Sequence, residues 1–314
     1  MNWQLHSLSI AGHSNSPEIA EQWRKSFASL PPANSGPDVQ VRLQQVEEMP
    51  DAPGQQPDFS EAGIMDFYVN SHDIIVHFPR FGQLRIDPGQ GETEGWLMPA
   101  AAKHPGIIED FLATGLSPHL RQAGMYLIHA FAAAVEDRAV LLVGGIGAGK
   151  TTTGMALVDA GWRLIANDSP IIDNALNARQ YPGLLAAYPD TYSRFMATRH
   201  LAANKPPEKK IALAAESIWQ DVWQTEAAIA AILFPKIENR EQHYLTALSP
   251  VETMQRLMPH TMERWDRANM QAHLALISRL SSHAPGYILH LGTDTETIPA
   301  TVSDCLRASN VLSD

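Results

Sequence analysis

The stretch AVLLVGGIGAGKTTTGMALVDAGWRLIAND, residues 139–168, decides the fold. It opens with an apolar run (139–145), and unbroken apolar character predicts a strand covered by helices on both faces. The residues from Gly144 to Thr151 then match the Gly-x4-Gly-Lys-Thr pattern, the P-loop or Walker A motif, and a helical pattern follows at 151–161. A strand, this motif and a helix in succession are the context in which the motif binds phosphate. The sequence therefore predicts an α/β domain organised around a nucleotide-binding loop.

The loop residues have separate expected roles. Glycines let the backbone wrap with its amide groups pointing inward, and the N-terminus of the following helix adds a favourable dipole for phosphate. Lys150 is expected to reach the β and γ phosphates, and the Thr151 hydroxyl is expected to ligate Mg²⁺. The nucleotide-binding residues predicted in this way are Gly144, Gly145, Ile146, Gly147, Ala148, Gly149, Lys150, Thr151 and Thr152. The alternative is a glycine turn that binds nothing.

A carboxylate follows the motif after a short interval. The residues WRLIAND (162–168) are typical of a strand that ends at Asp168, only eighteen residues after Lys150. Because a strand–helix–strand unit crosses over right-handedly, the end of its second strand returns to the same edge of the sheet. Asp168 is therefore expected to ligate the metal together with Thr151, or to take a proton from an incoming hydroxyl. The alternative is an aspartate that caps a turn before Pro170.

The rest of the chain predicts two regions, a small α+β region at 1–120 and the P-loop domain at 121–314. In the first region, alternating or helical spacing predicts a strand, a helix, a second strand and a set of short strands at 5–12, 17–30, 39–46 and 65–87. A helical pattern continues over 104–135.

Composition excludes several classes of protein. A formal net charge of −11 argues against a nucleic-acid binder, which needs clustered positive charge. The single cysteine, Cys305, excludes an internal disulfide and a metal site of paired thiolates. The N-terminus lacks the pattern of a signal peptide, and no run of apolar residues is long enough to span a membrane. We expect a cytoplasmic protein without a membrane span, and homo-oligomer formation is left open.

The run LIHAFAAAVEDRAVLLVGGIGAGKTTTGMALVDAGWRLIANDSPIID, residues 127–173, resembles the catalytic core of the HPr serine kinase/phosphorylase superfamily. That superfamily includes HPr-kinase-related kinases of lasso-peptide biosynthesis, and phosphoenolpyruvate carboxykinases share its compact order. His129 stands where the family has a histidine before the P-loop strand, and residues 227–260 resemble the following strand and helix. The resemblance implies an HPr-kinase-like fold that uses ATP or another nucleoside triphosphate with Mg²⁺. It also implies phosphoryl transfer to a hydroxyl, first of all a serine of a protein or peptide.

One departure from the family concerns the catalytic base. Where the family has two adjacent aspartates, the first of them thought to act as base, this chain has Asn167 followed by Asp168. An amide is not basic at neutral pH. Either Asp168 serves alone, or another group supplies the base, or activity is lost. His129 is the nearest candidate by resemblance, because an imidazole with a pKa near ~6.5 works as a base around neutrality. The alternative for His129 is a helix histidine satisfied in the core. The predicted catalytic residues are therefore Asp168, His129 and Lys150.

Two weaker features and the choice of function stay open. The basic stretch KPPEKK (205–210) lies where the family has a substrate-facing loop, and its lysines either neutralise a transferring phosphate or form a solvated charge run. The aromatic residues of 181–195 either line an acceptor groove or pack a core. The alternatives to a protein or peptide kinase are a kinase of a small-molecule alcohol and a nucleotide-binding regulatory or scaffold protein.

Overall fold

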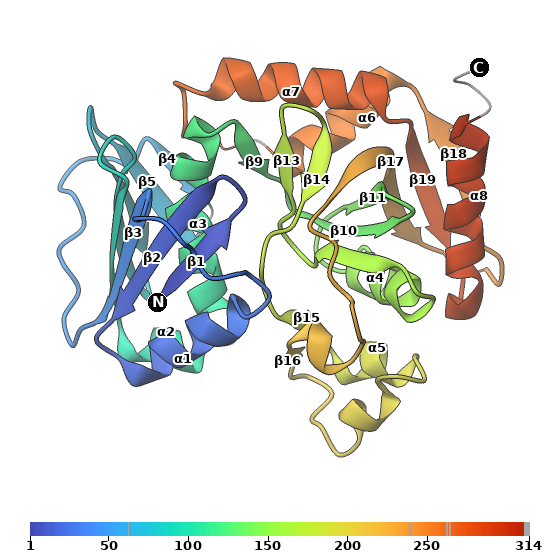
Figure 1. The fold of residues 1–314 in the computed structure, drawn as a ribbon, viewed down its shortest axis with the longest axis horizontal. Coiled ribbons are helices and arrows are strands. Elements are labelled where there is room, and N and C mark those ends of the chain that lie inside the picture. Colours follow the sequence, from blue (N-terminus) through green and yellow to red (C-terminus); the bar gives the residue numbers. More distant parts are fainter. Residues whose placement is uncertain (62, 239, 262, 264, 311–314) are drawn as a thin grey trace. The chain divides into compact units, whose positions relative to one another are not determined.

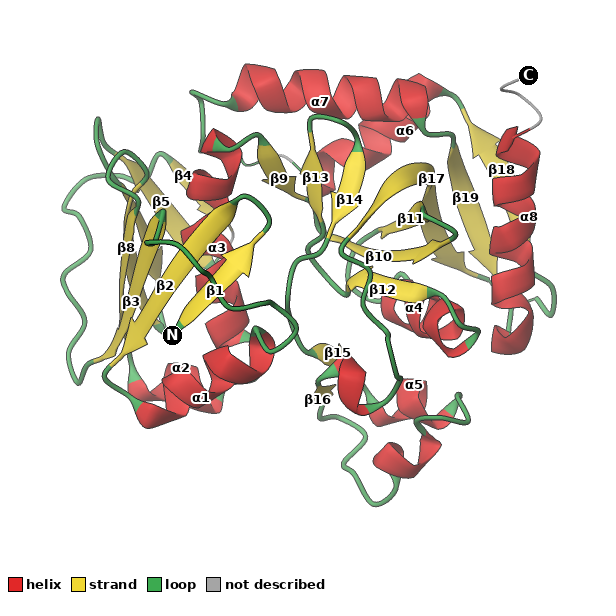
Figure 2. Cartoon of the chain, in the orientation of Figure 1, coloured by secondary structure: helices red, strands yellow, loops and turns green. Residues whose placement is uncertain are grey.

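The computed structural model describes residues 1–310 apart from 62, 239, 262 and 264. The fold is a mixture of helices and several β-sheets, shown in Figures 1 and 2. The chain forms two compact units. The first consists of Met1–Met125 and Glu263–Met270, and the second consists of Tyr126–Met262 and the residues from Gln271 onward. The sequence gives no sign that 263–270 returns to the first unit.

The first unit is built on an eight-stranded sheet with the order β1-β2-β3-β8-β7-β6-β5-β4. Its strands are β1 (Asn2–Leu5), β2 (Leu8–Ser14), β3 (Val39–Gln45), β4 (Phe59–Glu61), β5 (Met65–Val69), β6 (Ile74–Phe78), β7 (Gly82–Asp87) and β8 (Glu92–Leu97). Strand β3 runs parallel to both β2 and β8, and the other neighbours are antiparallel. The helices of this unit are α1 (Pro17–Ser26), α2 (Pro99–Lys103) and α3 (Ile107–Gln122).

The strand predicted at 5–12 is in fact part of a hairpin. Leu5 pairs with Leu8, and His6 between them has a φ of 54°, so the chain reverses there. Helix α1 then connects the parallel strands β2 and β3, and its Trp23 stacks on Trp3 of β1 with 5.3 Å between ring centroids. Apolar burial of these large rings holds α1 on the sheet.

The returning segment of the first unit is held by a buried cation. The Arg121 side chain is 1% exposed, and its Nε lies 2.9 Å from a carboxylate oxygen of Glu263. Its Nη1 lies 2.6 Å from a carboxylate oxygen of Asp266. Between these two carboxylates, Trp265 stacks on Phe67 with 5.3 Å between ring centroids. The segment is therefore fixed by both charge and aromatic packing.

The second unit contains a nine-stranded sheet with the path β12-β10-β11-β17-β14-β13-β9, in which β19 pairs with β17 and β18 pairs with β19. The strands are β9 (Met125–Leu127), β10 (Ala130–Val135), β11 (Arg138–Val143), β12 (Arg163–Ala166), β13 (Ile171–Asp173), β14 (Asn177–Arg179), β17 (Glu226–Ile237), β18 (Tyr244–Leu248) and β19 (Gly286–Leu291). Strands β11, β17 and β19 are mutually parallel.

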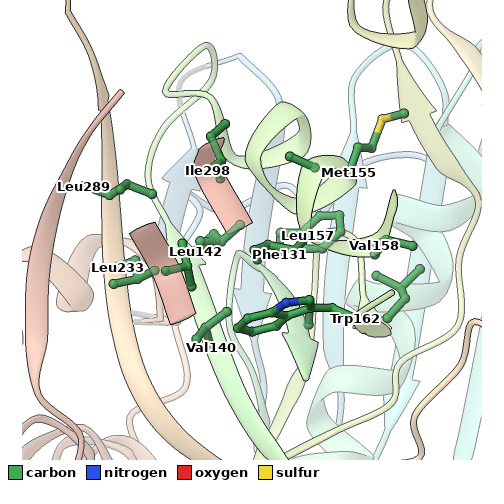
Figure 3. Packing of buried hydrophobic residues seen from close by; sticks show 14 of the residues in the cluster. Phe131, Val140, Leu142, Met155, Leu157, Val158, Trp162, Leu233, Leu289 and Ile298 are labelled. Atoms are coloured by element: carbon green, nitrogen blue, oxygen red, sulfur yellow. The ribbon is translucent and has the colours of Figure 1, made fainter. Parts of the chain in front are cut away.

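Helices cover both faces of this sheet. They are α4 (Lys150–Asp159), α6 (Pro250–Leu257), α7 (Met270–His283) and α8 (Ile298–Asn310). Side chains of α4 and α8 share one buried cluster with Val140 and Leu142 of β11, part of which Figure 3 shows. Side chains of α6 and α7 share another cluster with Leu141 and Val143. The unbroken apolar run of β11 is thus buried on both faces, as its composition predicts.

The helix predicted over 104–135 is wrong beyond residue 122. Helix α3 ends at Gln122, and the residues after it form β9 and β10. The alanine-rich run AFAAAV has good helix propensity, but in the structure β10 pairs with β11 on one side and β12 on the other. Tertiary pairing therefore overrides local propensity. A second consequence is that β10 separates β11 from β12, so the two strands joined by α4 are not neighbours.

A smaller element follows β14. Strands β15 (Leu185–Ala187) and β16 (Ile211–Leu213) form a two-stranded sheet, and α5 (Pro189–Ser193) and a 3-10 helix, η1 (Arg199–Ala202), lie between them in the chain. Three further 3-10 helices occur at Ala215–Ser217 (η2), Met258–His260 (η3) and Thr295–Thr297 (η4).

Candidate functional site

The topology brings three chain segments to one edge of the second unit's sheet. Strand β10 is antiparallel to both β11 and β12, so β11 and β12 point the same way. The register pairs the start of β10 with the last residue of β11, Ala130 with Val143. It also pairs Ala132 with Ala166, the last residue of β12. The residues just before β10 and just after β11 and β12 therefore share this edge, and they include His129, Gly144, Asn167 and Asp168.

The loop 144–149 connects β11 to α4, which begins at Lys150. Gly147 and Gly149 have φ values of 79° and 99°, a region that side-chain-bearing residues rarely adopt. A Cβ at Gly149 would lie 2.7 Å from Cδ1 of Leu291, at the end of β19. Ile146 at the tip of the loop is fully exposed. Ala148 lies in the same loop, and Thr151 and Thr152 occupy the first turn of α4.

Lys150 is buried, and its ammonium group turns back toward the loop. Nζ donates to the carbonyl oxygens of Gly144 at 2.5 Å and Gly145 at 3.3 Å. It also lies 3.1 Å from Nε2 of His129. Burial lowers the pKa of Lys150, the negative charge of Asp168 opposes this shift, and the positive charge of Lys210 adds to it. The predicted phosphate-binding lysine therefore lies in the electrostatic field of both residues.

His129 lies between Lys150 and Asp168. Its Nδ1 is 3.4 Å from Oδ1 of Asp168. Because an ammonium group can only donate, Nε2 of His129 accepts from Lys150, which places the proton of a neutral ring on Nδ1, facing the carboxylate. The main chain fixes this arrangement, since the amide of Ala130 donates to the carbonyl oxygen of Asp168 at 2.9 Å. His129 precedes a strand, so the expectation that it lies on a helix is wrong.

His260 is a member of this group that sequence reasoning missed. Its carbonyl oxygen accepts a hydrogen bond from the amide of His129 at 2.9 Å. Its ring lies 6.2 Å from the His129 ring, between centroids. Burial lowers the pKa of His260, and the charges of His129 and Lys150 lower it further. No local pattern marks this histidine, which comes from the 3-10 helix η3, far from the motif in the chain.

The aromatic residues of 181–195 and the lysines of 205–210 differ in burial. Most aromatic side chains of 181–195 are buried, including Tyr192 and Phe195, which join the cluster around α4. Tyr188 is the exception, with 47% of its surface exposed, and Nζ of Lys210 lies 5.6 Å from its ring centroid. Lys205, Lys209 and Lys210 are all exposed.

Metal ligands were predicted at Thr151 and Asp168. Thr151 follows Lys150 in the first turn of α4, and the Asp168 side chain is 60% exposed on the same edge of the sheet. Within the described part of the chain, no group of three or more histidine, cysteine, aspartate or glutamate side chains is placed to hold a metal ion. Across these residues, no helix combines the length and apolar character needed to cross a membrane.

Comparison with known proteins gives a fold-level likeness only. No protein-family model matches the chain, and no curated protein matches it. Among solved structures, the chain is similar to the Hpr(Ser) kinase/phosphatase from Coxiella burnetii, with 10% identity and a TM-score of 0.30. The match covers 60% of this chain and 97% of that one. A likeness this distant identifies no residue role, so we infer function from the site itself.

Proposed function

We propose that this protein is an ATP-dependent kinase that transfers the γ-phosphoryl group to a hydroxyl, with a serine of a protein or peptide as acceptor. The observation that carries the proposal is the position of Lys150. It opens a helix after a glycine-rich loop and lies 3.1 Å from His129, whose other ring nitrogen lies 3.4 Å from Asp168. A cation beside an oriented imidazole and a carboxylate is suited to phosphoryl transfer.

The loop and its surroundings fit a nucleoside triphosphate with Mg²⁺. The left-handed backbone at Gly147 and Gly149 allows the tight wrap that turns amide groups toward phosphate. Mg²⁺ bound to phosphates commonly takes only one or two protein ligands, and Thr151 and Asp168 would be these ligands here. When bound, Mg²⁺ and ATP supply the phosphoryl group and neutralise part of its charge. Lys150 would then leave the carbonyl oxygens of its own loop for the β and γ phosphates.

His129 gains a role from that movement. While Lys150 donates to it, Nε2 of His129 has no lone pair to offer a substrate. Once Lys150 turns to phosphate, Nε2 becomes an acceptor for the proton of an incoming hydroxyl, and Asp168 continues to orient the ring. Asp168 is itself exposed enough to take this proton directly. Because the transition state of phosphoryl transfer is largely dissociative, positioning and charge neutralisation matter more than the strength of the base. Asn167 in place of an aspartate is therefore compatible with activity.

A nucleotide-binding regulatory or scaffold protein is the second candidate. It is favoured by one observation, that Asn167 occupies the position of the family's base and uses its amide in a hydrogen bond to a main-chain carbonyl oxygen. A kinase that acts on a small-molecule alcohol differs from the first proposal only in its acceptor.

Calorimetric titration with ATP and with GTP in the presence of Mg²⁺ tests nucleotide binding. It also shows whether the protein prefers adenine or guanine nucleotides. We expect saturable binding that Lys150→Ala weakens strongly, because the loop loses its cation. Absence of binding at high micromolar nucleotide would refute the proposal. A radiolabelled γ-phosphate assay with serine-containing peptides then separates the two candidates. A kinase transfers label and loses about 10²–10⁴ in rate when Asp168 is replaced by Asn, whereas a regulatory protein binds nucleotide and transfers none.

A further inference from the structure

Asn167 and Asp168 are neighbours in sequence, but their side chains have different partners. Asp168 faces the ring of His129. The side-chain amide Nδ2 of Asn167 instead donates to the main-chain carbonyl oxygen of Leu184. Oδ1 of Asn167 lies 3.4 Å from the position that a Cβ on Gly183 would take, so the amide lies close to this stretch of backbone. Asn167 therefore contacts the chain at the point where the small sheet begins.

Residues 184–213, called the 184–213 segment below, form one folded element. The register of its sheet pairs Ala187 with Ile211, so Tyr188 and Lys210 lie opposite each other just beyond the paired residues. This explains why the ammonium group of Lys210 lies over the Tyr188 ring. The hydroxyl of the buried Tyr192 lies within hydrogen-bonding distance of carbonyl oxygens in both strands, 2.8 Å from that of Leu185 and 3.2 Å from that of Ile211. The two strands and α5 are therefore joined within one element.

The 184–213 segment, which carries Lys210, contacts the helix that begins at the loop 144–149. Oγ1 of Thr152 in α4 lies 3.4 Å from Oγ1 of Thr191 in α5. A cation that arrives beside the phosphates from a separate element can stabilise transferring charge only if that element is held in place.

We propose that Asn167 is a positioning residue, whose side-chain amide anchors the 184–213 segment beside α4 and thereby fixes the position of the element that carries Lys210. The anchoring is a property of the fold alone, whereas the role of Lys210 rests on the proposed function. An aspartate could not replace this asparagine, because a carboxylate only accepts hydrogen bonds and would face another acceptor, the carbonyl oxygen of Leu184. Residue 167 of this chain therefore has a structural role under this proposal and takes no part in proton transfer.

Hydrogen exchange in the absence of nucleotide tests the anchor. In Asn167→Asp and Asn167→Ala, the amides of β15 and β16 should exchange about 5- to 30-fold faster at pH 7, since losing the anchor weakens the attachment by one to two kcal/mol. The amides of β11 should be unaffected. Asn204→Asp is the matched control, because it introduces the same carboxylate at an exposed position of the same segment, and it should exchange like wild type. Wild-type exchange of β15 and β16 in both Asn167 variants would overturn the proposal.

The two variants also differ in their response to pH. A carboxyl group placed against a carbonyl oxygen has a raised pKa, and its protonated form is a donor that restores the lost hydrogen bond. At each pH, the exchange rate of the variant is divided by that of wild type. For Asn167→Asp this ratio should fall toward one as the pH is lowered from about 7 to about 4.5. For Asn167→Ala the ratio should stay the same. A general loosening of the fold would affect both variants alike, and that outcome would overturn the specific role of the amide.

The link to Lys210 has its own test in the phosphoryl-transfer assay. If Asn167 acts through Lys210, the double variant Asn167→Ala/Lys210→Gln should lose no more kcat than Lys210→Gln alone. Losses that multiply would overturn this link. A protein that binds no nucleotide would refute the proposed function and leave the exchange experiment as an independent test of the anchor.

Discussion

The loop 144–149 contains two glycines with very different surroundings, which allows a sharp test of its geometry. Gly149 has a φ of 99°, and a Cβ there would lie 2.7 Å from Cδ1 of Leu291. Gly145 lies in the same loop outside the left-handed region, and a Cβ there would meet no atom within 4 Å. Replacing glycine by alanine should therefore lower the free energy of unfolding much more at residue 149 than at residue 145.

The cost of Gly149→Ala has two parts. A left-handed backbone costs a side-chain-bearing residue roughly 1–2 kcal/mol. Leu291 is only 6% exposed and must also move to accept the new methyl group, and overpacking of this kind costs roughly 1–3 kcal/mol. The sum is at least about 2 kcal/mol, or a fall in the Tm of about 4–8 °C for a folding unit of this size. Gly145→Ala should remain within about 0.5 kcal/mol of wild type.

Differential scanning calorimetry of the wild type and the two variants measures these shifts, with attention to the transition of the second unit. Gly145→Ala serves as the control for adding a methyl group to the loop. If Gly149→Ala unfolded at the same temperature as Gly145→Ala, the left-handed turn and the contact with Leu291 would both be refuted. The described path of the loop into α4 would then be incorrect.

Two further predictions concern the first unit. Arg121→Met leaves the carboxylates of Glu263 and Asp266 without their buried cation and should destabilise this unit by about 3–5 kcal/mol in urea denaturation. Arg85→Met, which breaks an ion pair of a half-exposed arginine, should cost about 0–1 kcal/mol; equal losses would refute the buried network. Burial lowers the pKa of His119 to about 4. As the pH falls from 6.5, the histidine is protonated in the unfolded chain before it is protonated in the folded protein. The free energy of unfolding should therefore fall by roughly 3 kcal/mol between pH 6.5 and pH 4. His119→Gln should flatten this dependence in denaturation curves at pH 7 and pH 4.5, and an unchanged slope would contradict it.

The strand, loop and helix around residues 139–159 could be predicted because their signals are local. Apolar runs, glycines and helical periodicity act within one element, so the chain carries them wherever it folds. The error at 125–135 has the opposite origin. The alanines of 130–134 are compatible with a helix, and only pairing with β11 and β12, which lie later in the chain, makes 130–135 the strand β10. Local propensity cannot report a partner that is formed by tertiary structure.

The residues of the candidate site also fall into those with a signal in the sequence and those brought together only by the tertiary structure. Lys150 and the loop come from the motif, and His129 and Asp168 come from the resemblance together with the topology of a crossover. His260 approaches His129 only because η3 meets the edge where β10 begins, and the sequence contains no periodic or spacing signal for such a meeting. The contact of Asn167 with Leu184 depends in the same way on the fold of the segment that follows β14.

The pair at the end of β12 illustrates why a family position and a chemical role are different things. By the resemblance of the sequence, Asn167 stands where the HPr kinase superfamily has the first of two aspartates, and Asn167→Asp would reproduce that pair. By structure, the two residues have different partners, since Asp168 lies 3.4 Å from His129 and Asn167 donates to a main-chain carbonyl oxygen. A second carboxylate at residue 167 would face an acceptor, not a substrate proton. Asn167→Asp should therefore loosen the element that carries Lys210, and under the proposed function it should lower the rate of phosphoryl transfer.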